Sequence, residues 1–355
     1  MTTTPRCYLD HAATAPILPA AQQAWAQTAQ HWANPASPHA DGRSAQSLLE
    51  HARQQIAERL QWDGHIIFTG GATEALEIAI SRCKLPRRLL SAVEHDAVLR
   101  HASGEAIAVD SLGRIRADDL LAKLDTSSSP ALVAIQSVNN ETGVIQDLAG
   151  LGAIVRQRGG LLLADCAQSV AKLPLPDADM IVLSGHKFGA PPGVGALLIR
   201  DLKHLHAVGG QEQGYRPGTH NLPAIVALAA ALQVPVNWLD RAGELRDQLD
   251  HAITALGGEV VSLRANRLPT IASYRMPGVA ANVQLIKFDM AGYAVSAGAA
   301  CSSGTLKPSH VLAAMGMEAD AAAQVIRVSI GRSTTRAQIF GFIDQWKAIA
   351  SASRG

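Results

Sequence analysis

From about residue 45 to residue 240, short apolar runs alternate with stretches of helical periodicity. The runs are four to seven residues long and are flanked by Gly, Pro or Asp, which is typical of buried strands. The predicted strands are 66–69, 89–92, 131–137, 160–164, 180–183 and 195–199, and helices are expected between them, for example over 72–82 and 148–158. This alternation predicts an α/β fold with a mostly parallel central sheet and helices on both faces. Such sheets bind ligands beyond the carboxyl ends of their strands.

The pattern changes towards the C-terminus. Residues 224–256 are rich in Ala and Leu with helical periodicity, and alternating apolar runs follow at 270–275 and 325–329. We therefore expect a large α/β domain over residues 13–240 and a small α+β domain over residues 241–355.

Composition excludes several classes of function. The 355 residues are 48% apolar and 17% charged, with a net charge of +1 and 4% aromatic residues. This balance gives no general attraction to nucleic acid or to an anionic membrane. No apolar run reaches the roughly 20 residues that a membrane-spanning helix needs, and the N-terminus lacks the apolar core of a secretory signal.

The cysteines and histidines do not indicate a metal site. There are four cysteines without a CxxC pair and thirteen histidines without an HExxH spacing. Four thiols in a chain of this length favour a reducing compartment, so we expect a cytoplasmic protein.

Lys187 is the first candidate for chemistry. It stands in the segment SGHK, directly after the apolar strand 180–183 and before a turn rich in Gly and Pro. Desolvation at the end of a buried strand lowers the pKa of an amine and makes it nucleophilic towards an aldehyde. Ser184 and His186, on the same turn, could donate hydrogen bonds to a phosphate.

Two other strand ends carry groups that fit a phosphorylated ring. Asp165 ends a strand and could supply the carboxylate that a protonated pyridine nitrogen needs, and Gln168 could reach a phenolic oxygen. His95 closes a further strand, where it could stack on the ring and move protons. Each residue alone has a common structural explanation, such as a helix cap or a satisfied buried histidine.

A strand, a glycine turn and a helix follow one another at Phe68-Thr-Gly-Gly71-Ala72-Thr73. Backbone N–H groups and the helix dipole at such a turn bind phosphate, and Thr73 adds a hydroxyl. A Gly-Gly turn is a weak signal alone. With Lys187 and the other strand ends, it predicts a site for pyridoxal 5'-phosphate (PLP).

The chain resembles the cysteine desulfurases of the NifS/IscS-like branch, which have the class V aminotransferase fold, a PLP-dependent transferase fold of type I. The resemblance covers nearly the whole chain, and SGHK with an upstream DxxQ is specific for this fold. The matching stretches are YLDHAAT (8–14), NPAS (34–37), FTGGATEA (68–75), EH (94–95), VNNETGVIQD (138–147), ADCAQSV (164–170), SGHKFG (184–189), GGQEQGYRPGTHN (209–221) and VSAGAACSSGTLKPSHVL (295–312).

The resemblance implies roles around the cofactor. Lys187 would be the Schiff-base lysine, His95 would stack on the ring, and Asp165 and Gln168 would bind its nitrogen and its phenolic oxygen. The phosphate would be held by Gly71, Ala72, Thr73, Ser184 and His186. Thr219 would reach the phosphate of a neighbouring subunit, which implies a homodimer. Residues 1–12 would join the small domain.

The resemblance also implies a substrate and a nucleophile. Asn34, Asn140 and Arg327 would bind the carboxylate region of L-cysteine, for which a guanidinium is geometrically suited. Cys301, in a stretch of Gly, Ala and Ser that is suited to a mobile loop, would attack the substrate sulfur as a thiolate. The products would be L-alanine and a Cys301 persulfide. A sulfur acceptor, in this family often an iron–sulfur scaffold protein, would collect the sulfur.

Some positions depart from the family pattern, and alternatives stay open. The departures are Glu77, Cys166, Pro192 and Gln213. A selenocysteine lyase or a transaminase would use the same fold and cofactor. A non-catalytic sulfur-transfer scaffold would keep the fold alone, but it would have no need of the cofactor lysine.

Overall fold

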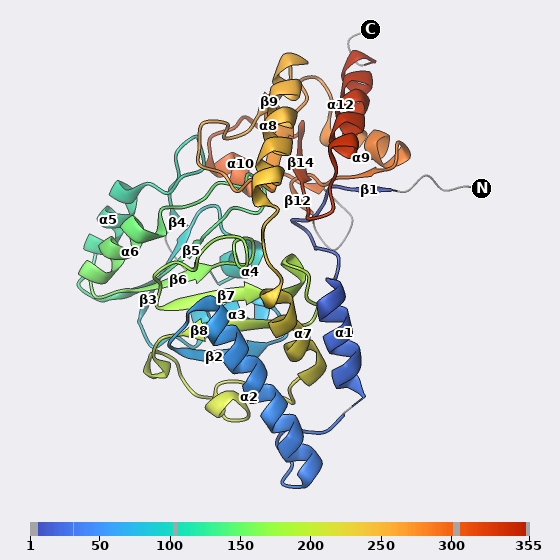
Figure 1. The fold of residues 1–355 in the computed structure, drawn as a ribbon. Helices are drawn as coiled ribbons and strands as arrows, with labels where there is room; N and C mark the ends of the chain where they lie inside the picture. Colours follow the sequence, from blue (N-terminus) through green and yellow to red (C-terminus); the bar gives the residue numbers. More distant parts are fainter. Residues whose placement is uncertain (1–5, 31, 102–105, 301–305, 353–355) are drawn as a thin grey trace.

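A seven-stranded sheet forms the centre of the molecule (Figure 1). The computed structural model describes residues 6–30, 32–101, 106–300 and 306–352. In spatial order, the strands are β2 (His65–Thr69), β8 (Gly195–Ile199), β7 (Met180–Ser184), β6 (Leu161–Asp165), β5 (Ala131–Gln136), β3 (Arg87–Ser91) and β4 (Ala106–Ile107). Only β8 runs opposite to the other six strands, which confirms the predicted mostly parallel sheet.

Helices cover both faces of this sheet, as the alternation of patterns predicted. The surrounding helices are α1 (Pro19–Ala29), α2 (Ala40–Leu60), α3 (Ala72–Ser81), α4 (Asp96–Leu99), α5 (Ala117–Asp125), α6 (Leu148–Gln157) and α7 (Leu222–Gln233). Successive strand residues belong to different apolar clusters: Val133 packs with α2 and α7, whereas Leu132 packs with α3 and α4. Both faces of the strands are therefore buried.

A second group of elements packs around its own apolar cluster, which includes Tyr274, Phe342 and Trp346. Its antiparallel sheet has the order β14–β10–β9, and β1 pairs with β11 beside it. The elements are β1 (Cys7–Tyr8), α8 (Leu239–Ala255), β9 (Glu259–Val260), β10 (Ile271–Arg275), α9 (Ala281–Met290), β11 (Tyr293–Ala294), β12 (Ala299–Ala300), β13 (Leu306–Lys307), α10 (His310–Ala314), α11 (Ala319–Ala322), β14 (Val325–Ser329) and α12 (Arg336–Ser351). The division at residues 12/13 and 240/241 stays a prediction.

The stretch 224–256 is two helices and not one. α7 ends at Gln233, α8 begins at Leu239, and Pro235 lies between them. Proline removes a backbone donor and restricts the residue before it, so the helical backbone does not continue through this point, although the apolar periodicity of the side chains resumes after it. Among the residues that the structure describes, none of the helices combines the length and apolar character needed to cross a lipid bilayer.

Candidate active site

A cavity of about 960 Å³ opens at the carboxyl edge of the large sheet. Most of the residues that the sequence singled out contribute to its wall: Gly71, Ala72, Thr73, His95, Asn140, Asp165, Gln168, Ser184, His186, Lys187 and Arg327. Asn34 and Thr219 do not line it. Cys301 lies outside the described residues.

Lys187 ends the short 3-10 turn Gly185–Lys187 that follows β7. Its Nζ donates hydrogen bonds to the carbonyl oxygens of Ala12, at 2.6 Å, and Ala13, at 2.9 Å. Burial, assisted by the positive charge of Arg327, lowers the pKa of the Lys187 amine to about 8. A substantial fraction of the amine is therefore the nucleophilic neutral form close to neutral pH.

Asp165 ends β6 and is 9% exposed. One carboxylate oxygen, Oδ1, accepts a hydrogen bond from the N–H of Ala167 at 2.9 Å. Burial raises the pKa of Asp165, and that hydrogen bond and the nearby His95 and Lys187 oppose the shift. A buried carboxylate of this kind is stabilised by a cationic partner, which a protonated pyridine nitrogen would be.

Gln168 supplies an unused acceptor beside Asp165. Its Nε2 donates to the carbonyl of Ala12 at 2.9 Å, while its Oε1 is buried without a hydrogen-bond partner. Because buried polar atoms rarely stay unpaired, this orphaned oxygen marks a place where a bound group would complete the site.

His95 caps the short helix α4 with its ring. Its Nδ1 accepts the N–H of Ala97 at 3.1 Å, so in the neutral ring the proton is on Nε2. Burial lowers the pKa of His95, with Asp165 opposing the shift. The ring is therefore held as a neutral Nε2–H donor in the wall of the cavity.

The start of α3 forms an uncapped helix N-terminus in the same wall. Its N-cap residue, Gly71, has φ of 152° and makes no side-chain cap hydrogen bond. A Cβ on Gly195 of the neighbouring strand would lie 2.8 Å from the Cα of Gly71, so both positions favour glycine. The free N–H groups and the helix dipole fit a phosphate, with Thr73 close by.

His186 has a neutral ring at this site. Its Nδ1 lies 3.2 Å from the Oγ1 of Thr14. Burial, followed by the charge of Lys187, lowers the pKa of His186 to about 4. Contact with a phosphate would therefore depend on a hydrogen bond and not on a positive charge.

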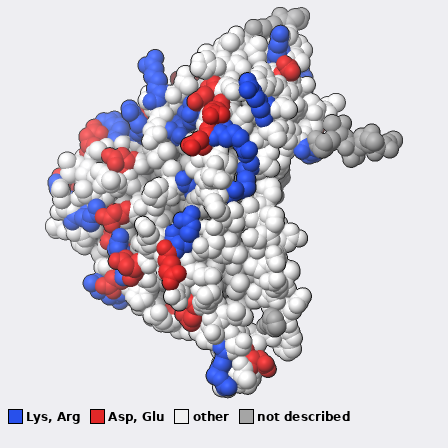
Figure 2. All heavy atoms as spheres, viewed as in Figure 1, with Lys and Arg blue, Asp and Glu red and all other residues white. Residues whose placement is uncertain are grey.

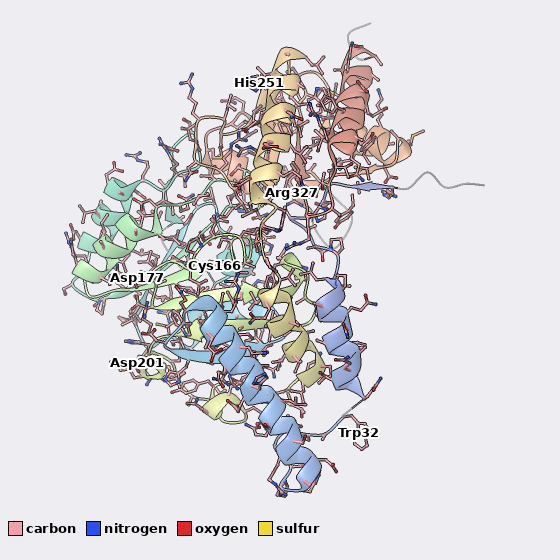
Figure 3. All side chains as sticks on the ribbon, viewed as in Figure 1. Trp32, Cys166, Asp177, Asp201, His251 and Arg327 are labelled. Carbon is pink, nitrogen blue, oxygen red and sulfur yellow. The ribbon has the colours of Figure 1, made fainter. Side chains whose placement is uncertain are left out.

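Arg327, on β14, has a side chain that is 8% exposed and fixed from two sides. Nη2 donates to Oδ1 of Asp10 at 2.8 Å, and Nη1 donates to the carbonyl of Asn140 at 3.1 Å. Its Nε is buried without a partner, which leaves one donor for a bound carboxylate. Figure 3 places Arg327 between the large sheet and the elements above it.

Sequence reasoning gave no role to Asp10. The residue stands inside YLDHAAT, one of the stretches that resemble the family, but no local pattern links it to Arg327. The two residues are 317 positions apart and meet only because β1 and β14 belong to the same packed group.

Asn34 and Thr219 lie away from this cavity. Asn34 is exposed between α1 and α2, where its Oδ1 accepts the N–H of Ala36 at 2.9 Å. Thr219 is exposed on the loop after Glu212–Gly214. That loop is anchored by the buried Glu212, which accepts a hydrogen bond from Nη1 of Arg53 at 2.9 Å.

The three cysteines that the structure describes, Cys7, Cys83 and Cys166, are poorly suited to act as nucleophiles. Burial raises the pKa of Cys7 to about 11 and that of Cys166 to about 12, and it also raises the pKa of Cys83. All three thiols are buried. Cys166, one of the departures from the family pattern, is therefore protonated and unreactive.

Two of the other three departures lie at the cavity, and the third lies away from it. Glu77 and Pro192 are in its wall, and Oε2 of Glu77 lies 3.0 Å from Nε2 of His101. Gln213 lies on the loop of Thr219 with φ of 55°. Among the described residues, no group of three or more His, Cys, Asp or Glu side chains could hold a metal ion.

Comparison with known proteins identifies the family. The model of the aminotransferase class-V family matches residues 7–342. The chain belongs to the aminotransferase class-V family. Among class V relatives, an IscS-like cysteine desulfurase of Mycobacterium tuberculosis is 34% identical over 94% of this chain and 93% of its own length. A cysteine desulfurase of Cereibacter sphaeroides is 36% identical over 94% and 93%.

Solved class V structures confirm the fold. The NifS-like protein of Rickettsia africae superposes with a TM-score of 0.90 at 29% identity, covering 98% of this chain and 99% of its own. The predicted type I α/β architecture is therefore confirmed, together with the resemblance to NifS/IscS-like proteins.

Proposed function

We propose that this class V protein is a PLP-dependent cysteine desulfurase that converts L-cysteine into L-alanine and passes the sulfur to Cys301. One observation carries the proposal. The lowered-pKa amine of Lys187 and the buried carboxylate of Asp165 share a cavity with the uncapped start of α3. An amine, a carboxylate and a phosphate cradle are the three features that a phosphorylated pyridine aldehyde requires.

The residues present fit PLP. We propose that Lys187 attaches the aldehyde, Asp165 binds the ring nitrogen, Gln168 binds the phenolic oxygen and His95 lies against the ring. The phosphate would be held by Gly71, Ala72, Thr73, Ser184 and His186. When bound, PLP supplies an electron sink for charge that develops on the substrate.

Arg327 and Lys187 have different roles towards the substrate: Arg327 binds it, and Lys187 removes a proton from it. Arg327, with Asn140 beside it, binds the α-carboxylate of L-cysteine and fixes the Cα–H bond relative to Lys187. The Lys187 amine, neutral above a pKa of about 8, then takes the Cα proton at Nζ.

Cys301 completes the reaction in this proposal. Its thiolate attacks the sulfur of the substrate, so an S–S bond forms while the Cβ–S bond breaks and its electron pair stays on carbon. Protonation of that carbon and return of a proton from Nζ of Lys187 to Cα give L-alanine, and Cys301 keeps the sulfur as a persulfide. A sulfur acceptor such as an iron–sulfur scaffold protein would then collect it.

A homodimer is the assembly that we propose. Figure 2 shows few charged side chains on the face over α1 and α7, and neither helix contains a charged residue. Trp25 is 44% exposed on α1, and Trp32, just beyond it, is 88% exposed. A second copy would cover such an apolar face, and the exposed Thr219 would then be free to reach the other subunit's phosphate site. Asn34 would likewise act across the dimer.

We also propose the division into domains at residues 13–240 and 241–355, with residues 1–12 in the small domain, and a cytoplasmic location.

The deciding experiment compares Cys301→Ala with Cys83→Ala, which removes a buried thiol. We expect Cys301→Ala to keep the absorbance of bound PLP and to lose alanine formation from L-cysteine, because the cofactor site is intact while the sulfur has no acceptor. Cys83→Ala should keep both. Mass spectrometry of the wild type during turnover should find one additional sulfur atom on Cys301.

Four results would contradict the proposal. Alanine formation that survives in Cys301→Ala would remove the sulfur mechanism, and activity on selenocysteine alone would indicate a lyase for that substrate. Amino transfer to a keto acid would indicate a transaminase. A purified protein without PLP that cannot take it up would indicate a non-catalytic scaffold.

A further inference from the structure

A second cavity, of about 240 Å³, lies on the other side of Lys187 from the start of α3. It lies where the start of α1, the end of α7 and the connection to α8 come together, below the small β14–β10–β9 sheet (Figure 1). We call it the rear cavity. Its wall is mainly apolar and includes Ile17, Leu18, Val234, Trp238 and Ile330.

The charged side chains of the rear cavity are all basic. Lys172, Lys187 and Arg332 line it with His11, and no aspartate or glutamate does so among the described residues. Nζ of Lys172 donates to the carbonyl of Gln168 at 3.0 Å, and Nη2 of Arg332 donates to a backbone carbonyl at 2.6 Å. Neither cation forms an ion pair with an acidic residue of the described chain.

The pKa values of Lys172, His11 and Arg332 are all lowered. Burial, followed by the charge of Lys187, lowers the pKa of Lys172 to about 8. Burial, followed by Lys172, lowers the pKa of His11 to about 4, and burial with Arg241 lowers the pKa of Arg332. His11 is therefore neutral, and Lys172 and Arg332 carry the positive charge beside the apolar wall. No acidic side chain of the cavity wall balances this charge, an arrangement that an anion would relieve.

A buried hydroxyl adds a second polar contact. Thr270 is 3% exposed and lines the rear cavity, and its Oγ1 has no hydrogen-bond partner. Hydroxyls buried in this way are normally paired, so the unpaired Thr270 indicates a missing polar group of a ligand.

We propose that the rear cavity binds a small organic anion with an apolar body and one carboxylate. The body would lie against Leu18, Val234 and Trp238, and the carboxylate would accept hydrogen bonds from Lys172 and Thr270. A neutral apolar ligand would leave the half-buried cations Lys172 and Arg332 without an acidic partner, and an extended polyanion would not fit into 240 Å³. The proposal does not depend on the desulfurase reaction, because it concerns binding alone.

Benzoate is the probe, titrated into the purified PLP-containing protein by calorimetry. We expect saturable binding that weakens at least about fivefold in Lys172→Gln and Lys172→Met, because both remove the counter-charge. Lys84→Gln, which removes an exposed lysine of the same domain, should bind benzoate like the wild type. Benzamide, the neutral analogue, should bind more weakly than benzoate.

Two further variants separate the rear cavity from the substrate site. Val234→Trp should fill the rear cavity and abolish binding, whereas Arg327→Gln should leave it unchanged. Loss of benzoate binding in Arg327→Gln, with normal binding in both Lys172 variants, would overturn the proposal in favour of the substrate carboxylate site. Absence of saturable binding in the wild type would overturn it as well.

Thermal unfolding shows whether each variant is correctly folded. Each variant should unfold cooperatively without benzoate, and benzoate should raise the unfolding temperature of the wild type but not that of Val234→Trp. If Lys172→Gln unfolds early, Lys172→Met decides, because it keeps the apolar length of the side chain. The desulfurase assay has a separate readout, so its failure would leave this result intact.

Discussion

The two sides of Lys187 differ in the sign of the charges around them. On the side of α3, the cavity contains both signs: Asp165 lies near Lys187, and Arg327 is paired with Asp10. In the rear cavity, only basic groups occur among the described residues. A wall of mixed sign suits a zwitterionic amino acid and a cofactor with cationic and anionic parts, whereas a basic wall suits a simple anion.

The two sides also arise differently along the chain. The wall near α3 comes from strand ends of a parallel sheet, which meet at one edge whatever their distance in sequence. The rear cavity is enclosed by connecting segments, including Pro16–Pro19 and Val234–Trp238, whose meeting depends on how the helices pack. The position of the charges on the first side therefore follows from the strand order, and the position of those on the second side follows from helix packing.

Asp165→Asn should have the largest effect among these predictions, because it removes a buried acidic group whose charge acts on Lys187. We expect turnover of L-cysteine to fall at least about 100-fold, the scale on which a pre-organised charge acts on a reacting group. Alanine formation with saturating PLP is the measurement. A fall below about threefold would contradict the role of Asp165 at the ring nitrogen.

The stability of the PLP-free protein provides the control for this variant. Burial raises the pKa of Asp165, so its ionisation destabilises the fold as pH rises through that pKa. PLP-free Asp165→Asn should therefore unfold at a higher temperature than the PLP-free wild type at pH 8, and the difference should shrink at low pH. A variant that is less stable at every pH would instead have lost a structural contact.

Asp10→Asn should have a smaller effect, on two quantities. The KM for L-cysteine should rise about fivefold, on the order of 1 kcal/mol, because Arg327 loses a charged acceptor. The charge of Asp10 also raises the pKa of Lys187, so its removal lowers that pKa further below its usual value. Uptake of PLP by the PLP-free protein, which needs the neutral amine, should then reach its half-maximal rate at lower pH.

Asp320→Asn is the matched control, because Asp320 is exposed on α11. It should change neither KM nor the pH of half-maximal PLP uptake. A shift of the profile towards higher pH in Asp10→Asn would contradict the stabilising effect of the Asp10 charge on the protonated Lys187 amine.

The sequence was sufficient to predict the features that depend on hydrophobic periodicity and on residues at strand ends. Lys187, Asp165 and His95 could be assigned to one site because each follows a buried strand of the same sheet, and parallel strands place their ends together. The resemblance added Arg327 and Asn140, which contact each other through the Asn140 carbonyl. The break between α7 and α8 was hidden, because side-chain periodicity continues on both sides of Pro235.

What depends on distant packing could not be predicted. Asp10 meets Arg327 across 317 positions, and the orphaned hydroxyl of Thr270 has no signature in the surrounding sequence. The same holds for the rear cavity, whose basic residues are spread from His11 to Arg332. Local patterns carry no information on such pairs, since their geometry is set only after the elements have packed.

Ala171→Gly should have the smallest effect, and it tests the rigidity of the rear cavity. Ala171 lines that cavity beside Lys172 and has φ of 62°, a left-handed conformation that costs a residue with a Cβ about 1–2 kcal/mol. Glycine removes this strain but loses about 0.5–1 kcal/mol through its larger freedom in the unfolded chain. The net gain in the free energy of unfolding should be about 0.5–1 kcal/mol, seen as a higher urea midpoint with an unchanged m-value.

Ala122→Gly is the control for Ala171→Gly, since Ala122 is exposed in the middle of the ordinary helix α5. There, glycine should destabilise the protein by about 1 kcal/mol, the opposite sign. If Ala171→Gly also destabilises, the strained backbone is offset by packing of the Ala171 methyl group against the rear cavity. In that case, benzoate binding should weaken in Ala171→Gly, because the wall next to Lys172 would have lost its fixed position.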